Sequence, residues 1–198
     1  MSIIIRDVRE HELDSVLAMN NAAGVGILPM DAAKVRFFWE NADYFRVAEV
    51  DGLIAGFLIA VSHDAAHDSS NFLWFRERYE KFLYIDRIVI ASARRSVGVG
   101  RVFYGDVQSF AEVRYPHLAA EVFIENDNHP ALIFHGSFGF REVGQHVMAP
   151  GNIRACMLLK DLCSYPFVQT THGDALPGQP WLAARALPGR TNTLATGT

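Results

Sequence analysis

The segment from Arg95 to Gly100 has the residue types and spacing of a phosphate-binding loop. It reads Arg-x-x-Gly-x-Gly and lies between a run rich in Ile and Val and an amphipathic segment. Glycine at positions 98 and 100 lets the backbone approach a ligand where a Cβ would clash. A helix that begins there presents unpaired N–H groups and the positive end of its dipole, which attract anions. We therefore expect a strand, an anion-binding loop and a helix, in that order.

Two familiar nucleotide-binding motifs do not fit this loop. A dinucleotide fingerprint needs a third glycine, and Phe103 stands where it would fall. A nucleotide P-loop needs a Gly-Lys-Ser/Thr sequence, which is absent. A glycine-containing turn without a ligand stays open as an alternative for the loop taken alone, because short glycine motifs often match by chance.

The elements around the loop predict a mixed sheet of class α/β (α+β). Periodicity indicates strands at 2–8, 45–50, 53–61, 84–90, 118–124, 140–148 and 154–162, and helices at 10–23, 31–41, 100–114 and 130–137. Asp51-Gly52 is a strong hairpin signal. The passage from 84 to 124 makes a right-handed crossover, which places one parallel pair in a mostly antiparallel sheet with helices on both faces.

Composition limits the classes of protein. A chain of 198 residues, half of them hydrophobic, suits one domain with a substantial core. The net charge of −4 without a basic stripe argues against nucleic acid as a partner. Leu53–Val61, the longest apolar run, is too short to span a membrane. The two cysteines, Cys156 and Cys163, lack a C-x-x-C spacing, so a reducing, cytoplasmic setting is expected. Residues 163–198 are rich in Pro, Gly and Thr and predict an extended or mobile tail after a domain at 1–162.

A second segment carries a resemblance to a known family. Asn128, Ala131, His135, Gly139 and Phe140 have the spacing N-x-x-A-x-x-x-H-x-x-x-G-F. Together with the glycine loop and the order of predicted elements, this segment makes residues 2–162 resemble the GNAT N-acetyltransferases, in particular an uncharacterised bacterial-type subgroup. Two segments in the right order are much harder to match by chance than either alone.

The resemblance implies a binding mode for acetyl-coenzyme A. Backbone amides from Val97 to Arg101 are expected to hold the pyrophosphate, with Arg95 and Arg101 near the phosphates. Backbone groups of Ile88 and Ile90 are expected to pair with the pantetheine arm, and a bulge near Ile88 to direct an N–H at the thioester oxygen. The cofactor-binding residues expected on this basis are Ile88, Ile90, Arg95, Ser96, Val97, Gly98, Val99, Gly100, Arg101, Asn128, Ala131 and Phe134.

The chain departs from the family pattern at His135. Many members have a tyrosine there, which is proposed to protonate the leaving thiolate. A histidine can donate a proton near neutral pH, so a general acid is one interpretation. A packed residue hydrogen-bonded to the backbone is the other.

Asp86 is the first candidate for the general base. Strand alternation predicts that Tyr84, Asp86, Ile88 and Ile90 share one face. If Ile88 faces the thioester, Asp86 lies two residues away, roughly 7 Å, which suits a base acting through water. An ion pair of Asp86 with Arg76, Arg78 or Arg87 is the alternative. Tyr84 is expected either to orient the acceptor or to pack, and Glu121 and Glu125 are further candidates for the base.

Residues 62–82 leave two questions open. His63 and His67 lie four apart in a polar stretch, which we interpret as a solvated loop, because no third metal ligand is evident. The following aromatic and charged stretch predicts a short helix that packs Phe72, Phe75 and Tyr79 on the core. An aromatic wall of the acceptor pocket is equally compatible with it.

The expected function is transfer of acetyl from acetyl-CoA to a primary amine by direct attack on the thioester. A small molecule, an amino acid or a peptide N-terminus could be the acceptor, and the resemblance allows a homodimer. Two alternatives stay open: an acyl-CoA-binding sensor without catalysis, and an enzyme that transfers a longer acyl group.

Overall fold

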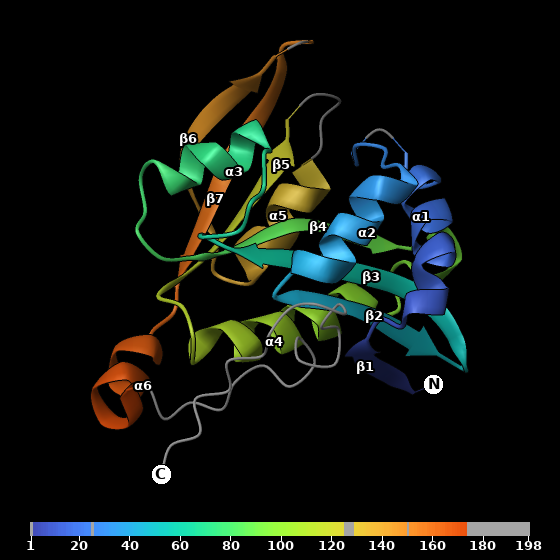
Figure 1. Cartoon of the computed structure of the whole chain (residues 1–198), viewed down its shortest axis with the longest axis horizontal. Helices are drawn as coiled ribbons and strands as arrows, with labels where there is room; N and C mark the ends of the chain where they lie inside the picture. The colour runs from blue at the N-terminus through green and yellow to red at the C-terminus, as the bar shows by residue number, and fades with distance from the viewer. Residues whose placement is uncertain (1, 25, 125–128, 150, 174–198) are drawn as a thin grey trace, which may run out of the picture.

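The computed structural model describes residues 2–24, 26–124, 129–149 and 151–173, and a seven-stranded sheet runs through them in the order β1-β2-β3-β4-β5-β7-β6 (Figure 1). The strands are β1 (Ile3–Asp7), β2 (Tyr44–Val50), β3 (Leu53–Ser62), β4 (Leu83–Ile90), β5 (His117–Phe123), β6 (Arg141–Met148) and β7 (Ile153–Asp161). Only β4 and β5 pair in parallel; the other neighbours are antiparallel. The predicted fold class is confirmed.

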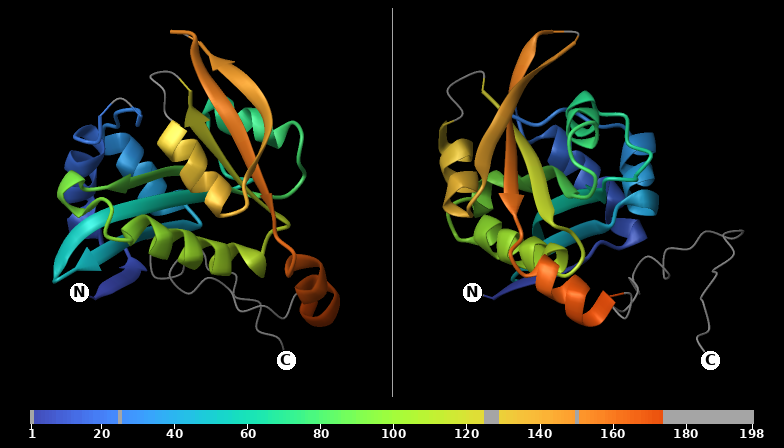
Figure 2. Two further views of the ribbon diagram at one scale, coloured as in Figure 1. Left: turned by 180° about the vertical axis from the view of Figure 1, so that it is seen from behind. Right: turned by 90° about the vertical axis from the view of Figure 1, so that its left-hand side faces the viewer.

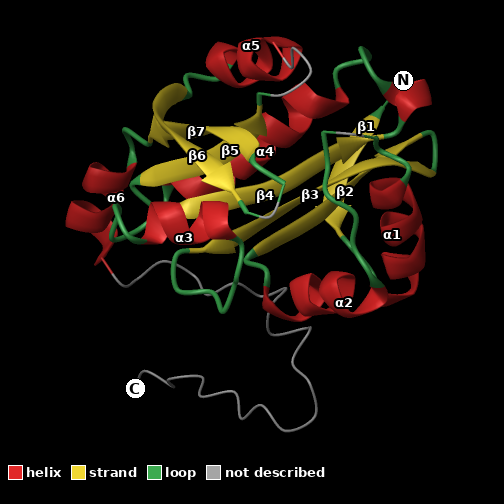
Figure 3. Cartoon of the chain, turned by 90° about the horizontal axis from the view of Figure 1, so that it is seen from above, coloured by secondary structure: helices red, strands yellow, loops and turns green. Residues whose placement is uncertain are grey.

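Helices cover both faces of the sheet. They are η1 (Glu10–Glu12), α1 (Leu13–Asn21), α2 (Ala32–Asn41), α3 (Ser70–Arg76), η2 (Ser92–Arg94), α4 (Val99–Glu112), α5 (His129–Ser137) and α6 (Tyr165–His172). Figure 3 shows α1, α2 and α3 on one side and α4 and α5 on the other. Two hydrophobic clusters correspond to these two sides. The hairpin of β6 and β7 projects beyond the rest of the sheet (Figure 2).

Local chemistry explains several of these boundaries. Asp31 caps α2, since its Oδ1 accepts a hydrogen bond of 2.7 Å from the backbone N–H of Lys34. Asp51 and Gly52 both have positive φ, 53° and 79°, as a tight two-residue hairpin turn requires. The buried residues of α4 recur at helical spacing and face the sheet.

Helix α6 differs from the sequence prediction. An extended or mobile segment was predicted from residue 163 onward, and this prediction is wrong for Tyr165–His172, which form a helix. Pro166 lies in the first turn, where proline needs no backbone donor and does not break a helix. The predicted tail beyond residue 173 lies outside the described residues.

A bulge at Asp86 interrupts the alternation of β4. Ile59 pairs with Arg87 and the next residue, Ala60, pairs with Ile85, so Asp86 is an extra residue without a partner in β3. Tyr84 consequently packs in the cluster beneath α1, α2 and α3, whereas Ile88 packs against the cluster beneath α4. The prediction that Tyr84, Asp86, Ile88 and Ile90 share one face is therefore wrong, because one inserted residue reverses the sides of those that follow.

Strands β4 and β5 separate soon after they meet. Their pairing covers only Leu83–Ile85 with Leu118–Ala120, although both strands continue. Beyond Ile85, the edge of β4 that faces β5 has no strand partner among the described residues. The sheet therefore opens as a wedge in its middle.

Candidate active site

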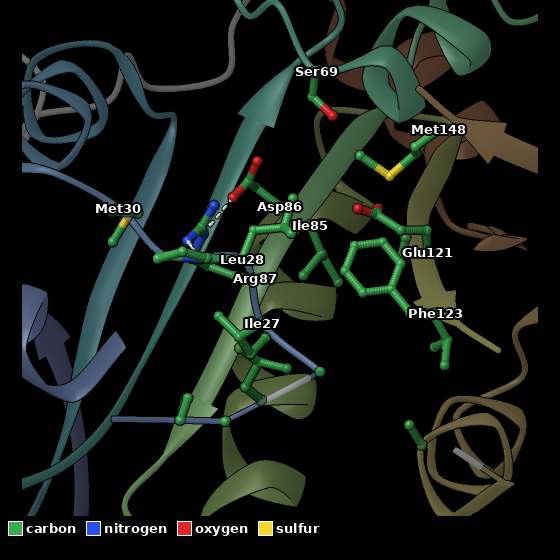
Figure 4. A pocket seen from close by; sticks show the side chains of 18 of the residues that line it. Ile27, Leu28, Met30, Ser69, Ile85, Asp86, Arg87, Glu121, Phe123 and Met148 are labelled. Atoms are coloured by element: carbon green, nitrogen blue, oxygen red, sulfur yellow. Dashed lines mark hydrogen bonds and ion pairs between the residues drawn. The ribbon is translucent and has the colours of Figure 1, made fainter. Parts of the chain in front are cut away.

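A cavity of about 830 Å³ lies at this wedge, between the two sides of the sheet. Its walls come from the α1–α2 connection, from β4 at 85–88, from β5 at 120–123, and from Ala131 and His135 of α5. Figure 4 shows the side chains of Asp86 and Glu121 on opposite sides of the opening, with Met148 and Ser69 above Glu121. The lining combines apolar side chains with a few polar ones, which is typical of a binding site for a small molecule.

Glu121 is the carboxyl group best placed for proton transfer. It projects from β5 into the cavity on the same side of the sheet as Tyr84. Its Oε1 accepts a hydrogen bond of 3.2 Å from Nδ2 of Asn71. Its Oε2 is buried and makes no hydrogen bond of regular geometry among the described residues, although the buried hydroxyl of Tyr84 is close enough to stabilise the ionised carboxylate. Burial is the main cause that raises the pKa of Glu121 to about 7, and the nearby charge of Asp86 adds to it.

Asp86 has the opposite environment. Its Oδ1 lies 2.9 Å from Nε2 of His67 and its Oδ2 lies 2.6 Å from Nε of Arg87. Burial opposes ionisation, but the charge of Arg87 and the contact with His67 outweigh it and lower the pKa of Asp86 to about 2. Of the ion pairs with Arg76, Arg78 or Arg87 that were the alternative to a catalytic role for Asp86, the structure contains the one with Arg87. A carboxylate held in this way takes up a proton poorly at neutral pH.

Arg87 connects the bulge to the α1–α2 connection. Its Nη1 donates to Oδ1 of Asn20 at 2.8 Å and to the carbonyl of Leu28 at 3.0 Å. Since Leu28 lines the cavity, this arginine holds one cavity wall at a fixed distance from β4.

His67 is a core residue. Its side chain is 1% exposed and lies among the rings of Phe37, Phe72 and Tyr84. The prediction that residues 62–71 form a solvated loop is wrong at this position, because the contact of 2.9 Å with Asp86 and the surrounding rings compensate for the burial of the imidazole. The predicted packing of Phe72 and Phe75 on the core is confirmed, since both are fully buried.

His135 is engaged at both ring nitrogens. Nδ1 lies 2.8 Å from the carbonyl oxygen of Ala131 and therefore carries the proton; Nε2 lies 2.6 Å from the hydroxyl of Tyr104, which donates to it. Burial lowers the pKa of this histidine, so the neutral imidazole is favoured. The geometry favours the interpretation of His135 as a packed, neutral side chain in the cavity wall.

The glycine loop has the backbone conformation that an anion cradle needs. Gly98 has φ of 94° and is the N-cap of α4, and Ser96 has φ of 64°. A side chain at Gly100 would place its Cβ 3.2 Å from the ring of Phe134. The first-turn N–H groups of α4 lack intrahelical acceptors and point out of the helix. Arg95 lines the cavity, and its Nη2 lies 3.5 Å from the carbonyl oxygen of Ala23.

Two of the predicted site residues, Asn128 and Glu125, lie outside the described residues. Conversely, three residues with no motif of their own form a group beside Glu121: Asn71 contacts its carboxyl group, and His146 and Met148 contact Asn71. They come from parts of the chain 50 to 77 residues from their partners, so no local signal could have identified them.

The comparisons with known proteins agree with this geometry. The model of the Acetyltransferase (GNAT) family matches residues 13–140. The chain belongs to the GNAT acetyltransferase family. No curated protein matches it significantly.

Solved structures share the fold at low sequence identity. The ribosomal-protein-S18-alanine N-acetyltransferase from Escherichia coli has a TM-score of 0.60 and 15% identity, covering 81% of this chain and 94% of that one. Ard1 from Thermoplasma volcanium has a TM-score of 0.65 and 16% identity, over 82% and 99%. The NatC complex bound to Gag peptide and CoA has a TM-score of 0.61 and 15% identity, again over 82% and 99%. Within the described residues, no helix is both long and apolar enough to cross a bilayer.

Proposed function

We propose that the protein is an acetyl-CoA-dependent N-acetyltransferase in which Glu121 is the general base that deprotonates a primary amine. The observation that carries this proposal is a carboxyl group that lines the cavity at the point where β4 and β5 separate and whose pKa is raised to about 7. A base is most effective when its pKa lies near the working pH.

The residues present fit acetyl-CoA. The loop at 95–101 provides a left-handed backbone at Gly98 and a helix N-terminus for the pyrophosphate. The open edge of β4 beyond Ile85 provides backbone groups for the amides of the pantetheine arm, near Ile88 and Ile90. Ala131 and Phe134 border the same side. Acetyl-CoA supplies an acyl group on a good leaving thiol, and a structure of the NatC complex with CoA gives a precedent for the fold.

Glu121 then acts from the other side of the wedge. Its Oε2 accepts the proton of the ammonium, and the neutral amine forms a C–N bond with the carbonyl carbon while the C–S bond breaks. Tyr84, whose buried hydroxyl interacts with the carboxyl group of Glu121, helps to position that base. Because both ring nitrogens of His135 are engaged, the second proton of the amine nitrogen, released as the amide forms, passes through water to the departing thiolate sulfur. Asp86 is an ionised structural group in this scheme, although it was the first candidate from the sequence.

Thiol release on mixing the protein with acetyl-CoA and a panel of primary amines and short peptides with free α-amino groups tests this function. We expect Glu121→Gln to lower kcat/KM by about 100-fold or more, the usual contribution of a general base, without changing the affinity for CoA. Glu77→Gln, at an exposed residue, is the matched control and should leave both unchanged.

Three outcomes are informative. Full activity of the Glu121→Gln variant would contradict the role of Glu121. Tight CoA binding without transfer to any acceptor would instead support the acyl-CoA-binding sensor. Failure to bind CoA would contradict both the acetyltransferase and the acyl-CoA-binding sensor.

A further inference from the structure

The side chains of Glu121, Asn71 and His146 form a hydrogen-bonded chain that leads from β5 to the β6–β7 hairpin. Asn71, at the start of α3, is fully buried. Its Nδ2 lies 3.2 Å from Oε1 of Glu121 and 3.2 Å from Sδ of Met148, and its Oδ1 lies 2.9 Å from Nδ1 of half-buried His146. The chain therefore joins β5, α3 and β6.

The chemistry of the groups determines which atom donates at each step. An ionised carboxylate can only accept, so the NH2 group of Asn71 must face Glu121. The carbonyl oxygen of Asn71 then faces His146, whose Nδ1 must carry the proton. This arrangement holds whether or not Nε2 of His146 is protonated, because Nδ1 donates in both states.

The contact between α3 and the hairpin is a close fit that depends on one glycine. A Cβ at Gly144 of β6 would lie 2.8 Å from the ring of Trp74 in α3. The absence of a side chain at Gly144 lets α3 approach β6 closely, two residues from His146. The position of Asn71 against Glu121 is thus built into the packing of two elements.

We propose that Asn71, held in one orientation by His146, is a positioning residue that fixes Oε1 of Glu121 and leaves Oε2 directed at the acceptor amine. The inference rests on the proposed function, because it assigns a partner to the proposed base. Without His146, the Asn71 amide can rotate by 180° and place its carbonyl against the carboxylate, which disfavours the ionised base.

The other charged and titratable groups around Glu121 come from neighbouring elements. β4 contributes Tyr84, Asp86 and Arg87, and α4 contributes Tyr104. None of these is altered by substitutions at Asn71 or His146, so a change in the titration of Glu121 reports on the chain itself.

The test is an NMR titration of the side-chain carboxyl carbons in protein labelled with 13C-glutamate, with the Glu121 signal assigned by its loss in Glu121→Gln. We expect Asn71→Asp to raise the pKa of Glu121 by roughly one unit, because a donor is replaced by a like charge. Asn41→Asp is the matched control: Asn41 donates to the carbonyl of Phe37 away from the cavity, and its substitution should leave the titration unchanged.

A second pair of variants tests His146 at its half-buried position. His146→Leu removes the donor and should raise the pKa of Glu121 in the same direction. In His146→Asn the amide nitrogen occupies the place of Nδ1, so we expect the wild-type titration to be restored. The acidic limb of thiol release should move in parallel with the titration in each variant.

An unchanged titration in both Asn71→Asp and His146→Leu would overturn the proposal, and so would a shift in His146→Asn equal to that in His146→Leu. The titration needs no acceptor and no turnover. If Glu121→Gln retains activity while the titration shifts as expected, the proposed function fails and the hydrogen-bonded chain stands.

Discussion

The hydroxyl of Tyr104 lies 2.6 Å from Nε2 of His135, and both groups are buried between α4 and α5. Tyr104 also contacts the rings of Phe134, Phe138 and Phe140, so this tyrosine organises the packing around the start of the G-F segment. His135, which occupies the position of the family's tyrosine, is thus held by a hydrogen bond to Tyr104.

Removing the hydroxyl of Tyr104 should cost stability. Tyr104→Phe leaves Nε2 of His135 buried without a donor, and we expect the free energy of unfolding to fall by about 1–2 kcal/mol. Urea denaturation measures the change. Tyr165→Phe, which removes a hydroxyl that contacts Lys81 at the surface, should change it by less than about 0.5 kcal/mol. Equal effects of the two substitutions would argue against a structural role for the Tyr104–His135 pair.

Glu121 should make the protein less stable at high pH. The folded state raises the pKa of this group from 4.5 to about 7, so it binds more protons than the unfolded state between these values. Stability from this group is therefore present at low pH and lost as pH rises through about 7. We expect Glu121→Gln to be more stable than wild type by roughly 1–3 kcal/mol at pH 8, with a much smaller difference at pH 5. Denaturation curves at both pH values would show a constant difference if the carboxyl were not buried.

Asp86 should contribute in the opposite direction. Its folded-state pKa is lowered from 3.8 to about 2, so its stabilising effect is present above pH 4 and lost as pH falls towards 2. Asp86→Asn leaves Arg87 without its buried counter-charge, and we expect a loss of about 3 kcal/mol at pH 7. Asp68→Asn, at an exposed ion pair with Lys34, should cost less than about 1 kcal/mol. Comparable losses for the two substitutions in urea denaturation would contradict the special status of the Asp86 pair.

Gly98 and Gly105 provide a matched test of the proposed role of the glycine loop in binding phosphate. Gly98→Ala imposes a side chain on a residue with φ of 94°, and we expect CoA affinity, measured by calorimetry, to fall by about tenfold, or 1.4 kcal/mol. Gly105→Ala, in the same helix with open space around the added Cβ, should stabilise the protein by about 0.5–1 kcal/mol and leave CoA affinity unchanged. Undiminished CoA affinity in Gly98→Ala would remove the loop from the binding site.

The positions of most strands and helices along the chain could be predicted from the sequence because their signals are local, whereas the order of the strands within the sheet was not predicted. Alternating apolar residues, the turn at Asp51-Gly52 and the glycine loop each lie within a few neighbours along the chain. The bulge at Asp86 has no such signal, since Tyr84–Ile90 reads as a regular strand with or without one extra residue. Its existence depends on the pairing with Ile59 and Ala60 of β3.

The choice between Asp86 and Glu121 also depended on three-dimensional contacts. Both carboxylates follow apolar residues in predicted strands, and their spacing does not distinguish them. Arg87 and His67 keep Asp86 ionised, whereas burial raises the pKa of Glu121, which lies beside Asn71, to about 7. His67 and Asn71 both lie in the stretch 62–82, and their contacts with Asp86 and Glu121 could be identified only from the folded structure.

The short pairing between β4 and β5 has a mechanical consequence. Three residue pairs connect the half of the sheet that contains β1–β4 to the half that contains β5–β7, so the strand pairing between these halves is shortest beside the proposed reaction centre. A ligand arm inserted there acts as an eighth strand over part of the sheet and bridges the two halves. Amide hydrogens on the edge of β4 that faces β5, beyond Ile85, should then exchange with solvent freely in the ligand-free protein and slowly once the arm is in place.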